Sequence, residues 1–558
     1  MKLKLIFLLL IIGSCVLLAE DLLLDIMFTN DIHGGIDRYP ATFMNPDFPP
    51  ILGGGGSAAT YIKSVRKLSD KKNRDNLLVD AGDFFQGHPV GTMSEGRAVI
   101  KYFNMIGYDL SVVGNHEYDL GEDVLIKTYK LAKFPILSCN IVKKGTDELV
   151  DYVQPYIIIE KMGVRIGIIG LTTTDTALMS FPENIKNVDF LPAKKALEKY
   201  IKIVQAEGVD LIFAVGHMGL PYSPEPVYKS RYIDKPETPV ERYWGYDAQE
   251  LAHEVEGVDV FFSGHIHKGF AEAWEDPVTH TMIFQGYAYG SNVGHLILKI
   301  DKATRTISGY DKPAIKEGVL ITVFEDEFIP DEEIAESILA MQKVAEEGMD
   351  EVIGEAGMHI SKDGSGPQNM IGNLVCEAML DFTDADFSFL NLGGVRGDLQ
   401  IGPITYRNVF NVMPFDNQVV LMDIDGEFLK EIIEMRVSGG RHGLRVAGIN
   451  VVVNRERDSY DRITKLLIGG EPWQADKIYK VATTDFLLQG NAGLVMLTKI
   501  PESQITRYET GLRDAIVEYI KKKSPVTTKI DDRWKHDNNS KQTPELLKEL
   551  EKSREKKD

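Results

Sequence analysis

The sequence is poor in cysteine, which excludes several ways of stabilising a fold or binding a metal. Its 558 residues include three cysteines, Cys15, Cys139 and Cys376. Once a leader carrying Cys15 is removed, two widely separated cysteines remain. Neither a disulfide framework nor a Cys-x-x-Cys metal site can be built from such a pair. Any metal ion must therefore be bound by oxygen and imidazole ligands.

The sequence also lacks an excess of positive charge. It contains 62 lysines and arginines and 83 aspartates and glutamates, which gives a formal net charge of −21. Because nucleic-acid-binding surfaces are normally basic, we expect no nucleic-acid partner. A small phosphate ester remains compatible with this charge, since a local metal or arginine cluster outweighs the overall field.

An apolar run long enough for a confident membrane span is missing from the N-terminus. Two lysines precede the apolar stretch at about residues 5–18, which is shorter than the roughly 18 residues of a spanning helix. The pattern predicts a signal peptide over 1–19, cleaved after Ala19, and export to the periplasm or the extracellular space. The segment "IGSC" leaves lipid anchoring through Cys15 as an alternative, and an uncleaved anchor as a third. Membrane contact is expected only through this segment.

Strand-like apolar runs alternate with helical patterns over the first part of the chain. The uninterrupted apolar runs predict sheets that are covered on both faces. Helical patterns at about 59–70, 191–207 and 247–256 lie between them. This alternation predicts an α/β layer architecture. The proline-rich segment 221–243 has no clear period and predicts a long loop.

A helical pattern after Pro330 divides the chain. Ile334, Ile338, Met341 and Val344 recur at helical spacing and predict a linker helix. The tail has few apolar and many charged residues, which predicts disorder or a solvated helix. The predicted divisions are a leader over 1–19, a first domain over 20–328, the linker over 329–351, an α+β domain over 352–525 and a charged tail over 526–558.

Polar side chains of one chemical type follow the ends of the predicted strands. They are Asp31, His33, Asp83, Asn115, His116, Asp119, His217, His265 and His267. Ligand sites in open α/β sheets gather at the carboxyl ends of strands, so we expect these groups to converge. Alternation along a strand would point both imidazoles of the pair His265 and His267 to one face. Oxygen and imidazole donors of this number suit two divalent ions of Mn, Zn, Fe, Mg or Co, with Asp83 bridging them.

The motifs "DIH", "GD", "GNHEYD", "GHMG" and "GHIH" resemble those of the calcineurin-like metallophosphoesterases. Two later segments, "NLGGVRGDLQIGPITYRNVFNVMPFDNQVV" and "TTDFLLQGNAG", narrow the resemblance to the 5′-nucleotidase family, which is related to UDP-sugar hydrolases and 2′,3′-cyclic-nucleotide phosphodiesterases. The resemblance covers about residues 22–525. It implies a four-layer αββα metallophosphoesterase sandwich, a linker helix and a C-terminal nucleotide-binding domain.

The resemblance also implies a role for each matching residue. One metal ion would be bound by Asp31, His33 and His267, the other by Asn115, His217 and His265, with Asp83 between them. His116 would be the catalytic imidazole, oriented by Asp119. The implied activity is an exported phosphohydrolase of nucleotide catabolism, in which a metal-bound hydroxide attacks phosphorus in line.

For the substrate, the resemblance implies binding by Asn391, Arg396, Phe415, Asn417 and Phe486, with the two phenylalanines enclosing the base. This sequence departs from the family at two places. Ala492 stands where the family usually has an aspartate that binds the ribose hydroxyls, and the segment before Asn369 lacks an expected arginine. A buried hydroxyl without its acceptor is costly.

These departures put ordinary ribonucleoside monophosphates in doubt. They leave a deoxynucleotide, a cyclic nucleotide, a nucleotide sugar or another phosphate ester as alternatives, with Asn491 as a substitute sugar contact. Two further alternatives are a thiosulfohydrolase-like enzyme of the same fold and a non-catalytic surface binding protein. The filled metal positions and the intact His116 favour a phosphohydrolase.

Overall fold

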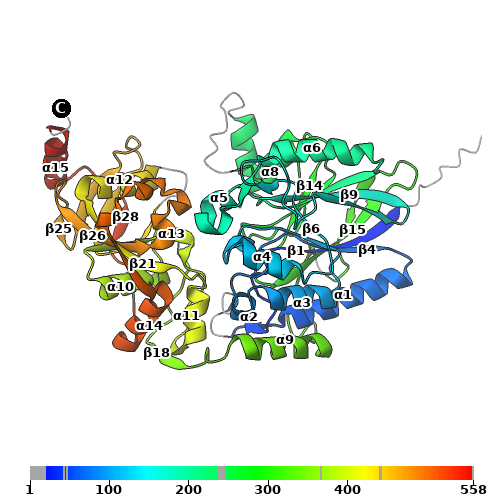
Figure 1. Cartoon of the computed structure of the whole chain (residues 1–558), viewed down its shortest axis with the longest axis horizontal. Helices are drawn as coiled ribbons and strands as arrows, with labels where there is room; N and C mark the ends of the chain where they lie inside the picture. The colour runs from blue at the N-terminus through cyan, green and yellow to red at the C-terminus, as the bar shows by residue number, and fades with distance from the viewer. Residues whose placement is uncertain are drawn as a thin grey trace, which may run out of the picture.

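The structure is a computed structural model that describes residues 21–41, 44–45, 48–234, 245–315, 317–364, 367–438 and 443–555. The predicted signal peptide and Cys15 lie outside these residues, so the leader stays a prediction. None of the described helices combines the length and the apolar character needed to cross a membrane. Figure 1 shows two domains side by side, the first coloured blue to green and the second yellow to red.

Two sheets form the centre of the first domain. One has the order β16-β15-β1-β4-β5-β6, with β17 also paired to β15, and the other has the order β13-β14-β12-β11-β9-β8. The strands of the first sheet are β1 Leu22–Thr29, β4 Asn76–Asp80, β5 Leu110–Val112, β6 Ile136–Leu137, β15 Asn292–Ile300, β16 Ile307–Asp311 and β17 Leu320–Thr322. Those of the second are β8 Tyr156–Lys161, β9 Val164–Thr172, β11 Leu211–His217, β12 Val260–Ser263, β13 Trp274–Glu275 and β14 Met282–Gln285.

The two sheets pack face to face because their strands are apolar on both sides. In β1, Ile26 and Phe28 join the core between the sheets, whereas Met27 joins the core beneath the outer helices. The helices α1 Gly54–Lys71, α3 Arg97–Ile106 and α4 Glu122–Tyr129 cover the first sheet, and α6 Ala193–Ala206 and α8 Ala248–Glu254 cover the second. The expected four-layer αββα sandwich is thereby confirmed. Strands β1, β4 and β5 run parallel, as do β9, β11, β12 and β14, so within each group the carboxyl ends share one edge.

The proline-rich segment 221–243 is more regular than expected in its described part. Residues Pro224–Tyr228 form helix α7, and Lys229–Ile233 continue it as a π-helical turn. The expectation of an irregular loop was wrong here. Proline is tolerated at the first turn of a helix, where its missing N–H has no partner to lose, and this explains how such a segment begins one.

The predicted linker helix is α9, Glu332–Ala345, and its N-cap Asp331 accepts a hydrogen bond from the Ile334 backbone N–H. Ile334 and Ile338 are buried in the helical core of the first domain. Val344, which the helical pattern grouped with them, is 83% exposed. Helix α9 therefore packs beneath the first domain, and the chain crosses to the second domain after it (Figure 1).

The second domain is α+β. Its five-stranded sheet has the order β22-β19-β26-β21-β27, and its four-stranded sheet the order β25-β24-β23-β28. The strands are β18 Val352–Ala356, β19 Phe387–Leu390, β20 Gly402–Thr405, β21 Gln418–Asp425, β22 Arg445–Ala447, β23 Ile449–Val453, β24 Ile463–Ile468, β25 Glu471–Pro472, β26 Ile478–Thr484, β27 Ile505–Gly511 and β28 Trp534–His536. The helices are α10 Met370–Thr383, α11 Tyr406–Val412, α12 Gly426–Ser438, α13 Asp485–Leu488, α14 Leu512–Lys523 and α15 Pro544–Glu555.

The segment expected to be a solvated tail is part of this domain. Strand β28 pairs with β23, and the side chain of Trp534 is buried in the core. Leu546 on α15 joins the same core. The expectation of disorder was wrong and that of a solvated helix holds in part, since α15 is a largely exposed helix. A few well-placed apolar residues suffice to dock a short charged segment that shows no long apolar pattern.

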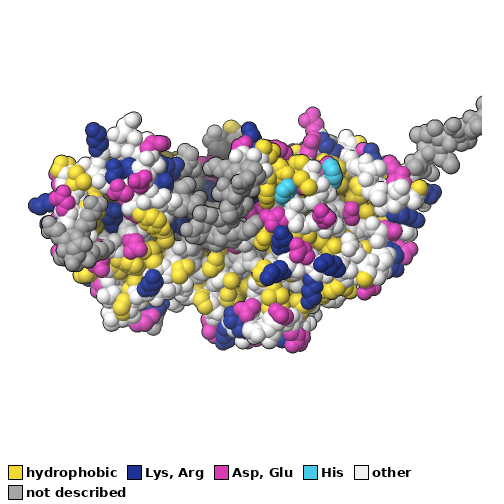
Figure 2. All heavy atoms as spheres, turned by 90° about the horizontal axis from the view of Figure 1, so that it is seen from above, with side chains coloured by type: hydrophobic (Ala, Val, Ile, Leu, Met, Phe, Trp, Pro, Cys, Tyr) yellow, Lys and Arg dark blue, Asp and Glu magenta, His cyan; other side chains and the backbone are white. Residues whose placement is uncertain are grey.

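The net negative charge is spread over the surface. Figure 2 shows basic and acidic side chains interspersed on both domains, without an extended basic stripe among the described residues of this face. A polyanion would find no continuous positive surface there.

Candidate metal centre and adjoining cavity

Six of the seven predicted ligands form two adjoining groups at or just beyond the ends of the first domain's strands. One group is Asp31, His33 and His267, and the other is Asp83, His217 and His265. Within each group the ligand atoms lie within 4.8 Å of one another. Each group draws on loops from both sheets, so the packing of the two sheets creates the centre.

Two carboxylates lie between the groups. The Oδ2 atom of Asp83 is 2.9 Å from His217 Nε2 and 3.8 Å from His33 Nε2. The Oδ1 atom of Asp31 is 3.4 Å from His267 Nε2 and 3.8 Å from His217 Nε2. Asp83 therefore lies between His217 of its own group and His33 of the other.

The hydrogen bonds of the imidazoles leave lone pairs facing the centre. His217 Nδ1 lies 2.8 Å from the Ala81 carbonyl, and His33 Nδ1 bonds to the Gln86 carbonyl. A carbonyl only accepts, so each Nδ1 carries a proton, and a ring that gives up its second proton to a metal ion turns an unprotonated Nε2 inward. His33 Nε2 then lies 2.9 Å from His267 Nε2. Nitrogen and carboxylate acceptors at such spacing need cations between them, which fits two bound metal ions.

Several of these residues have a left-handed backbone. The φ angles of Asp31, His33, Asp83, His265 and His267 lie between 48° and 79°. Each such angle on a non-glycine residue costs about 1–2 kcal/mol. His265 and His267 lie beyond the end of β12, so strand alternation is the wrong explanation for their placement. The left-handed turns deliver them instead, and each imidazole belongs to a different group.

The charges of the centre are strongly coupled. Burial raises the pKa of Asp31 to about 6, with a further contribution from Asp83. Burial opposes charge on His217, but the carboxylates of Asp83 and Asp31 raise its pKa to about 10. Burial would also raise the pKa of Asp83, yet the surrounding imidazoles hold it well below its usual value. A cluster of this kind attracts cations in exchange for protons.

The predicted catalytic pair is assembled beside the metal ligands. His116 Nδ1 lies 2.6 Å from Asp119 Oδ2, and the His116 backbone N–H donates to Asp83 Oδ1 at 2.8 Å. Burial lowers the pKa of His116, but Asp119 and Asp83 outweigh it, so the pKa lies above its ordinary value. The neighbouring Asn115 is buried, and its Oδ1 has no hydrogen-bond partner among the described residues. An amide oxygen in this state is a suitable metal ligand.

Glu117 is a site residue that sequence reasoning missed. Its carboxylate accepts hydrogen bonds from the backbone N–H groups of Asp83 at 3.0 Å, Phe84 at 2.9 Å and Gly114 at 2.6 Å. Burial, with a contribution from Asp83, raises the pKa of Glu117 to about 8. Glu117 thus ties together the two loops that carry Asp83 and Asn115. Its place inside the "GNHEYD" motif was the available signal.

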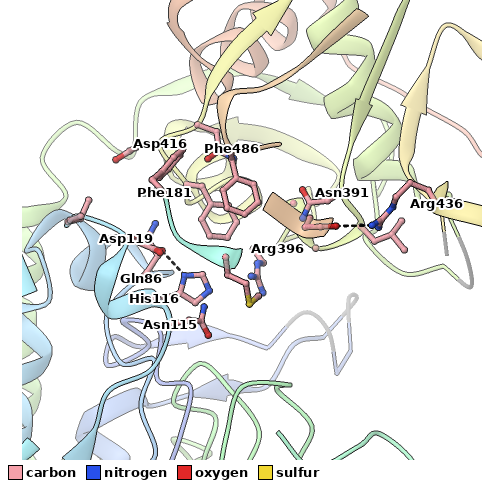
Figure 3. A pocket seen from close by; sticks show the side chains of 18 residues that line it. Gln86, Asn115, His116, Asp119, Phe181, Asn391, Arg396, Asp416, Arg436 and Phe486 are labelled. Atoms are coloured by element: carbon pink, nitrogen blue, oxygen red, sulfur yellow. Dashed lines mark hydrogen bonds and ion pairs between the residues drawn. The ribbon is translucent and has the colours of Figure 1, made fainter. Parts of the chain in front are cut away.

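A cavity of about 290 Å³ lies between the two domains and opens onto this pair (Figure 3). Its lining includes eight residues predicted from the sequence: Asn115, His116, Asp119, Asn391, Arg396, Phe415, Asn417 and Phe486. Ala492 also lines it, whereas Asn491, the suggested substitute sugar contact, is buried behind it. The predicted catalytic and substrate residues therefore share one cavity.

Phe415 and Arg396 lie at the end of the cavity nearest the catalytic pair. The ring of Phe415 stacks on that of His116, with centroids 5.9 Å apart and an interplanar angle of 20°. The Arg396 guanidinium lies over the same ring, 5.2 Å from its centroid. The second domain thus places an aromatic face and a positive charge beside the metal centre.

Sequence reasoning missed further lining residues, among them Gln86, Met179, Phe181 and Arg436. Arg436 had a readable signal, because it occupies the apolar stripe of α12 with Ile432 and Ile433, where arginine is rare. Gln86 and Phe181 face the other domain, and no local pattern reports such a contact.

Comparisons with known proteins agree with the motifs. The family model described as calcineurin-like phosphoesterase matches residues 24–269, and that described as 5′-nucleotidase, C-terminal domain, matches residues 351–499. The chain is 30% identical to a 5′-nucleotidase of Vibrio parahaemolyticus, over 90% of each protein. It is 28% identical to the endonuclease YhcR of Bacillus subtilis over 90% of this chain, but it spans 40% of that longer protein.

A solved structure shares the arrangement. The 5′-nucleotidase precursor of Thermus thermophilus superposes with a TM-score of 0.78 at 25% identity, and the match covers 93% of this chain and 100% of the other. Both domains and the region between them are included in that coverage.

Proposed function

The chain belongs to the 5′-nucleotidase family of calcineurin-like metallophosphoesterases and is a hydrolase, and from this premise we propose that it releases phosphate from nucleotides or closely related phosphate esters. One observation carries the proposal. The His–Asp centre belongs to the first domain and the cavity beside it is lined by both domains, so a phosphoryl group at the centre would extend its ester toward the second domain.

Our assignment of the metal ligands starts from the two His–Asp groups and adds Asn115 for its buried amide oxygen without a hydrogen-bond partner among the described residues. Asp31, His33 and His267 would hold one divalent ion, and His217, His265 and Asn115 the other, with Asp83 shared. Two such ions, when bound, lower the pKa of a water molecule and neutralise phosphoryl oxygens. Imidazole and carboxylate ligands suit Mn, Zn, Co, Fe or Mg.

The residues around the centre would act on the phosphoryl group and its leaving oxygen. His116, whose Nδ1 proton is directed to Asp119, offers Nε2 to the phosphoryl group. A protonated ring donates a hydrogen bond there and stabilises developing negative charge. Arg396 adds a second positive charge from the other domain. No covalent bond between the enzyme and phosphorus is required.

The second domain would position the organic part of the substrate. Phe415 and Phe486 offer aromatic faces for a base, and Asn391 and Asn417 offer amide groups. Stacking of a base on an aromatic side chain contributes about 1–3 kcal/mol. A planar nucleobase therefore fits this cavity better than an aliphatic phosphate ester does.

Phosphate release tests the proposal. The chain without residues 1–19 is assayed with Mn, Co, Zn and Mg on AMP, deoxy-AMP, 2′,3′-cyclic AMP, a UDP-sugar and p-nitrophenyl phosphate. We expect metal-dependent release that the Asp83→Asn variant loses, because Asp83 contacts both groups. Full activity in Asp83→Asn would overturn the dimetal assignment. If metal is bound and no substrate releases phosphate, the proposed phosphohydrolase activity itself is wrong.

Export is a separate proposal that rests on the leader sequence alone. Cleavage after Ala19 would start the mature chain at Glu20. Mass spectrometry of the chain recovered from the periplasm or the medium decides between cleavage there and acylation of Cys15.

A further inference from the structure

Asn30 joins a predicted metal ligand of the first sheet to a loop of the second sheet. It directly follows strand β1, and the residue is buried. Its Nδ2 group donates to Asp31 Oδ2 at 2.7 Å and to the carbonyls of Gly286 at 3.2 Å and Tyr287 at 3.3 Å. The Gly286 backbone N–H donates back to Asn30 Oδ1 at 2.7 Å. One amide group therefore connects Asp31 to the segment that follows β14 of the second sheet.

These partners allow the Asn30 amide one orientation. Its NH₂ group faces an ionised carboxylate and two carbonyls, which accept hydrogen bonds and have none to donate. Turning the amide over would direct its oxygen at these three acceptors and its NH₂ group at the Gly286 N–H. The backbone of Gly286 and Tyr287 thus fixes the direction in which Asn30 donates to Asp31.

The hydrogen bond from Asn30 decides which oxygen of Asp31 faces the metal centre. Oδ2 accepts from Asn30 and, at 2.9 Å, from the His265 backbone N–H, which Oδ1 shares at 3.0 Å. Oδ1 lies 3.4 Å from His267 Nε2 and 3.8 Å from His33 Nε2. A carboxylate held through one oxygen presents the other oxygen to a cation, and the loss of such a supporting partner costs about 10–100-fold in metal affinity.

We propose that Asn30 is a positioning residue of the metal centre, which holds Asp31 so that Oδ1 binds the ion of the group Asp31, His33 and His267. This inference rests on the metal ligands assigned under the proposed function. Asn30 acts through Asp31 and is not itself a ligand. The ion of the other group should depend on Asn30 much less, because its imidazole ligands belong to other residues.

Equilibrium dialysis of the full mature chain against Mn²⁺, followed by elemental analysis, tests the inference. We expect the wild type to bind two ions per chain. In Asn30→Ala, one ion should require about 10–100-fold more Mn²⁺, whereas the other should bind within about threefold of its wild-type constant. Two unchanged constants, or equal weakening of both ions, would overturn the inference.

Asn140→Ala is the matched control. Asn140 is also buried, donates to the carbonyls of Thr172 at 2.8 Å and Leu191 at 3.2 Å, and accepts from the Thr172 N–H at 2.9 Å. Its amide joins backbone segments of the same domain, but in the described chain it has no hydrogen bond to a predicted metal ligand. Asn140→Ala should keep both Mn²⁺ constants. If it loses an ion as Asn30→Ala does, the loss reports a general loosening of the domain and the inference is wrong.

Gly286→Ala moves the Asn30 amide without changing it, and it decides the question if Asn30→Ala fails to fold. A Cβ atom at Gly286 would lie 2.8 Å from Asn30 Oδ1 and 2.9 Å from Asn292 Oδ1, so the Asn30 side chain must shift. We expect one ion to be weakened, as in Asn30→Ala, and two wild-type constants would contradict the inference.

The wild type separates this inference from the proposed function. If the wild type binds fewer than two ions, the dimetal assignment is wrong and the inference falls with it. If the wild type binds two ions and both variants bind them equally well, the inference alone is wrong and the phosphohydrolase stands.

Discussion

Gln86 and Pro414 are joined across the boundary between the two domains: the Gln86 Nε2 group donates to the Pro414 carbonyl at 3.1 Å. Gln86 also offers its own backbone carbonyl to the metal-centre residue His33, and Pro414 precedes the stacking residue Phe415. One side chain therefore links the metal centre to the wall that would hold the base.

Replacing Gln86 with alanine should weaken the use of large substrates. The loss of one cross-domain hydrogen bond predicts a three- to tenfold lower kcat/KM for nucleotides, at about 0.5–1.5 kcal/mol per bond. The loss for p-nitrophenyl phosphate should be smaller, because that substrate does not reach the second domain. Steady-state kinetics on both substrates measure the difference. Equal losses would contradict a role in joining the domains.

Removing one imidazole from the centre should empty part of it. His217→Ala removes a nitrogen placed 2.9 Å from Asp83 Oδ2, so we expect bound metal to fall from two ions to about one per chain and kcat to fall by about 10³. Elemental analysis and phosphate release measure the two effects. His280→Ala is the control, because the His280 side chain is 74% exposed and its ring pairs with the surface residue Glu275. Two ions retained in His217→Ala would refute the ligand assignment.

Replacing His116 with alanine should leave the metals in place and slow the chemical step. General acid–base and electrostatic contributions of an imidazole amount to about 10²–10⁴ in rate. Asp119→Asn should cost about 10–100-fold, because the ring loses its orienting carboxylate. Single-turnover rates and metal content separate the two effects. Asp123→Asn, at an exposed position close by, serves as the control, and metal loss from His116→Ala would argue for a ligand instead.

Glu117→Gln should destabilise the first domain. Above about pH 8 the ionised carboxylate accepts three backbone N–H bonds, whereas an amide would turn an NH₂ group toward one of those donors. A donor left unpaired in the interior costs about 1–3 kcal/mol. Thermal unfolding followed by circular dichroism should show a melting point lowered by a few degrees. An unchanged melting point would show that Glu117 does not brace the two loops.

Asp80 should make the stability depend on pH. Burial raises its pKa from 3.8 to about 7, despite hydrogen bonds from Thr29 and Ser111. The folded state therefore binds this proton more tightly than the unfolded state, so the contribution is full below about pH 4 and is lost as pH rises to about 7. Asp80→Asn should show a smaller fall in melting point between about pH 4.5 and pH 8 than the wild type. Asp70→Asn, at an exposed position, should keep the wild-type fall, and equal falls in all three proteins would contradict the prediction.

Much of the fold and of the metal centre could be predicted because its signals are local. Strands such as β1 and β11 are apolar on both faces, and the polar residues that follow them stand out against that background. Within each sheet the gathering of these residues at one edge follows from parallel strand order, and the face-to-face packing of the two sheets then brings the two edges together. The backbone conformation that places His265 and His267 could not be predicted, since a left-handed backbone at histidine has no sequence signature.

Only some of the residues that line the cavity between the domains could be predicted, for a physical reason. Phe415 and Phe486 belong to recognisable segments, whereas Phe181 gains its place only by contact with the other domain. Whether Val344 is buried or exposed likewise depends on where helix α9 leaves the first domain. Periodicity reports which face of a helix is apolar, but it does not report where the neighbouring element ends.

The left-handed turns at the predicted metal ligands affect how long the protein stays folded and resists proteolysis. Residues forced into such angles relax once nothing stabilises the conformation, and metal ions, when bound, would supply that stabilisation here. A chain starved of metal would open first at these loops, which would make them early targets for proteases. The amount of enzyme present would then follow the local supply of divalent ions, because scarcity would remove the protein as well as its activity.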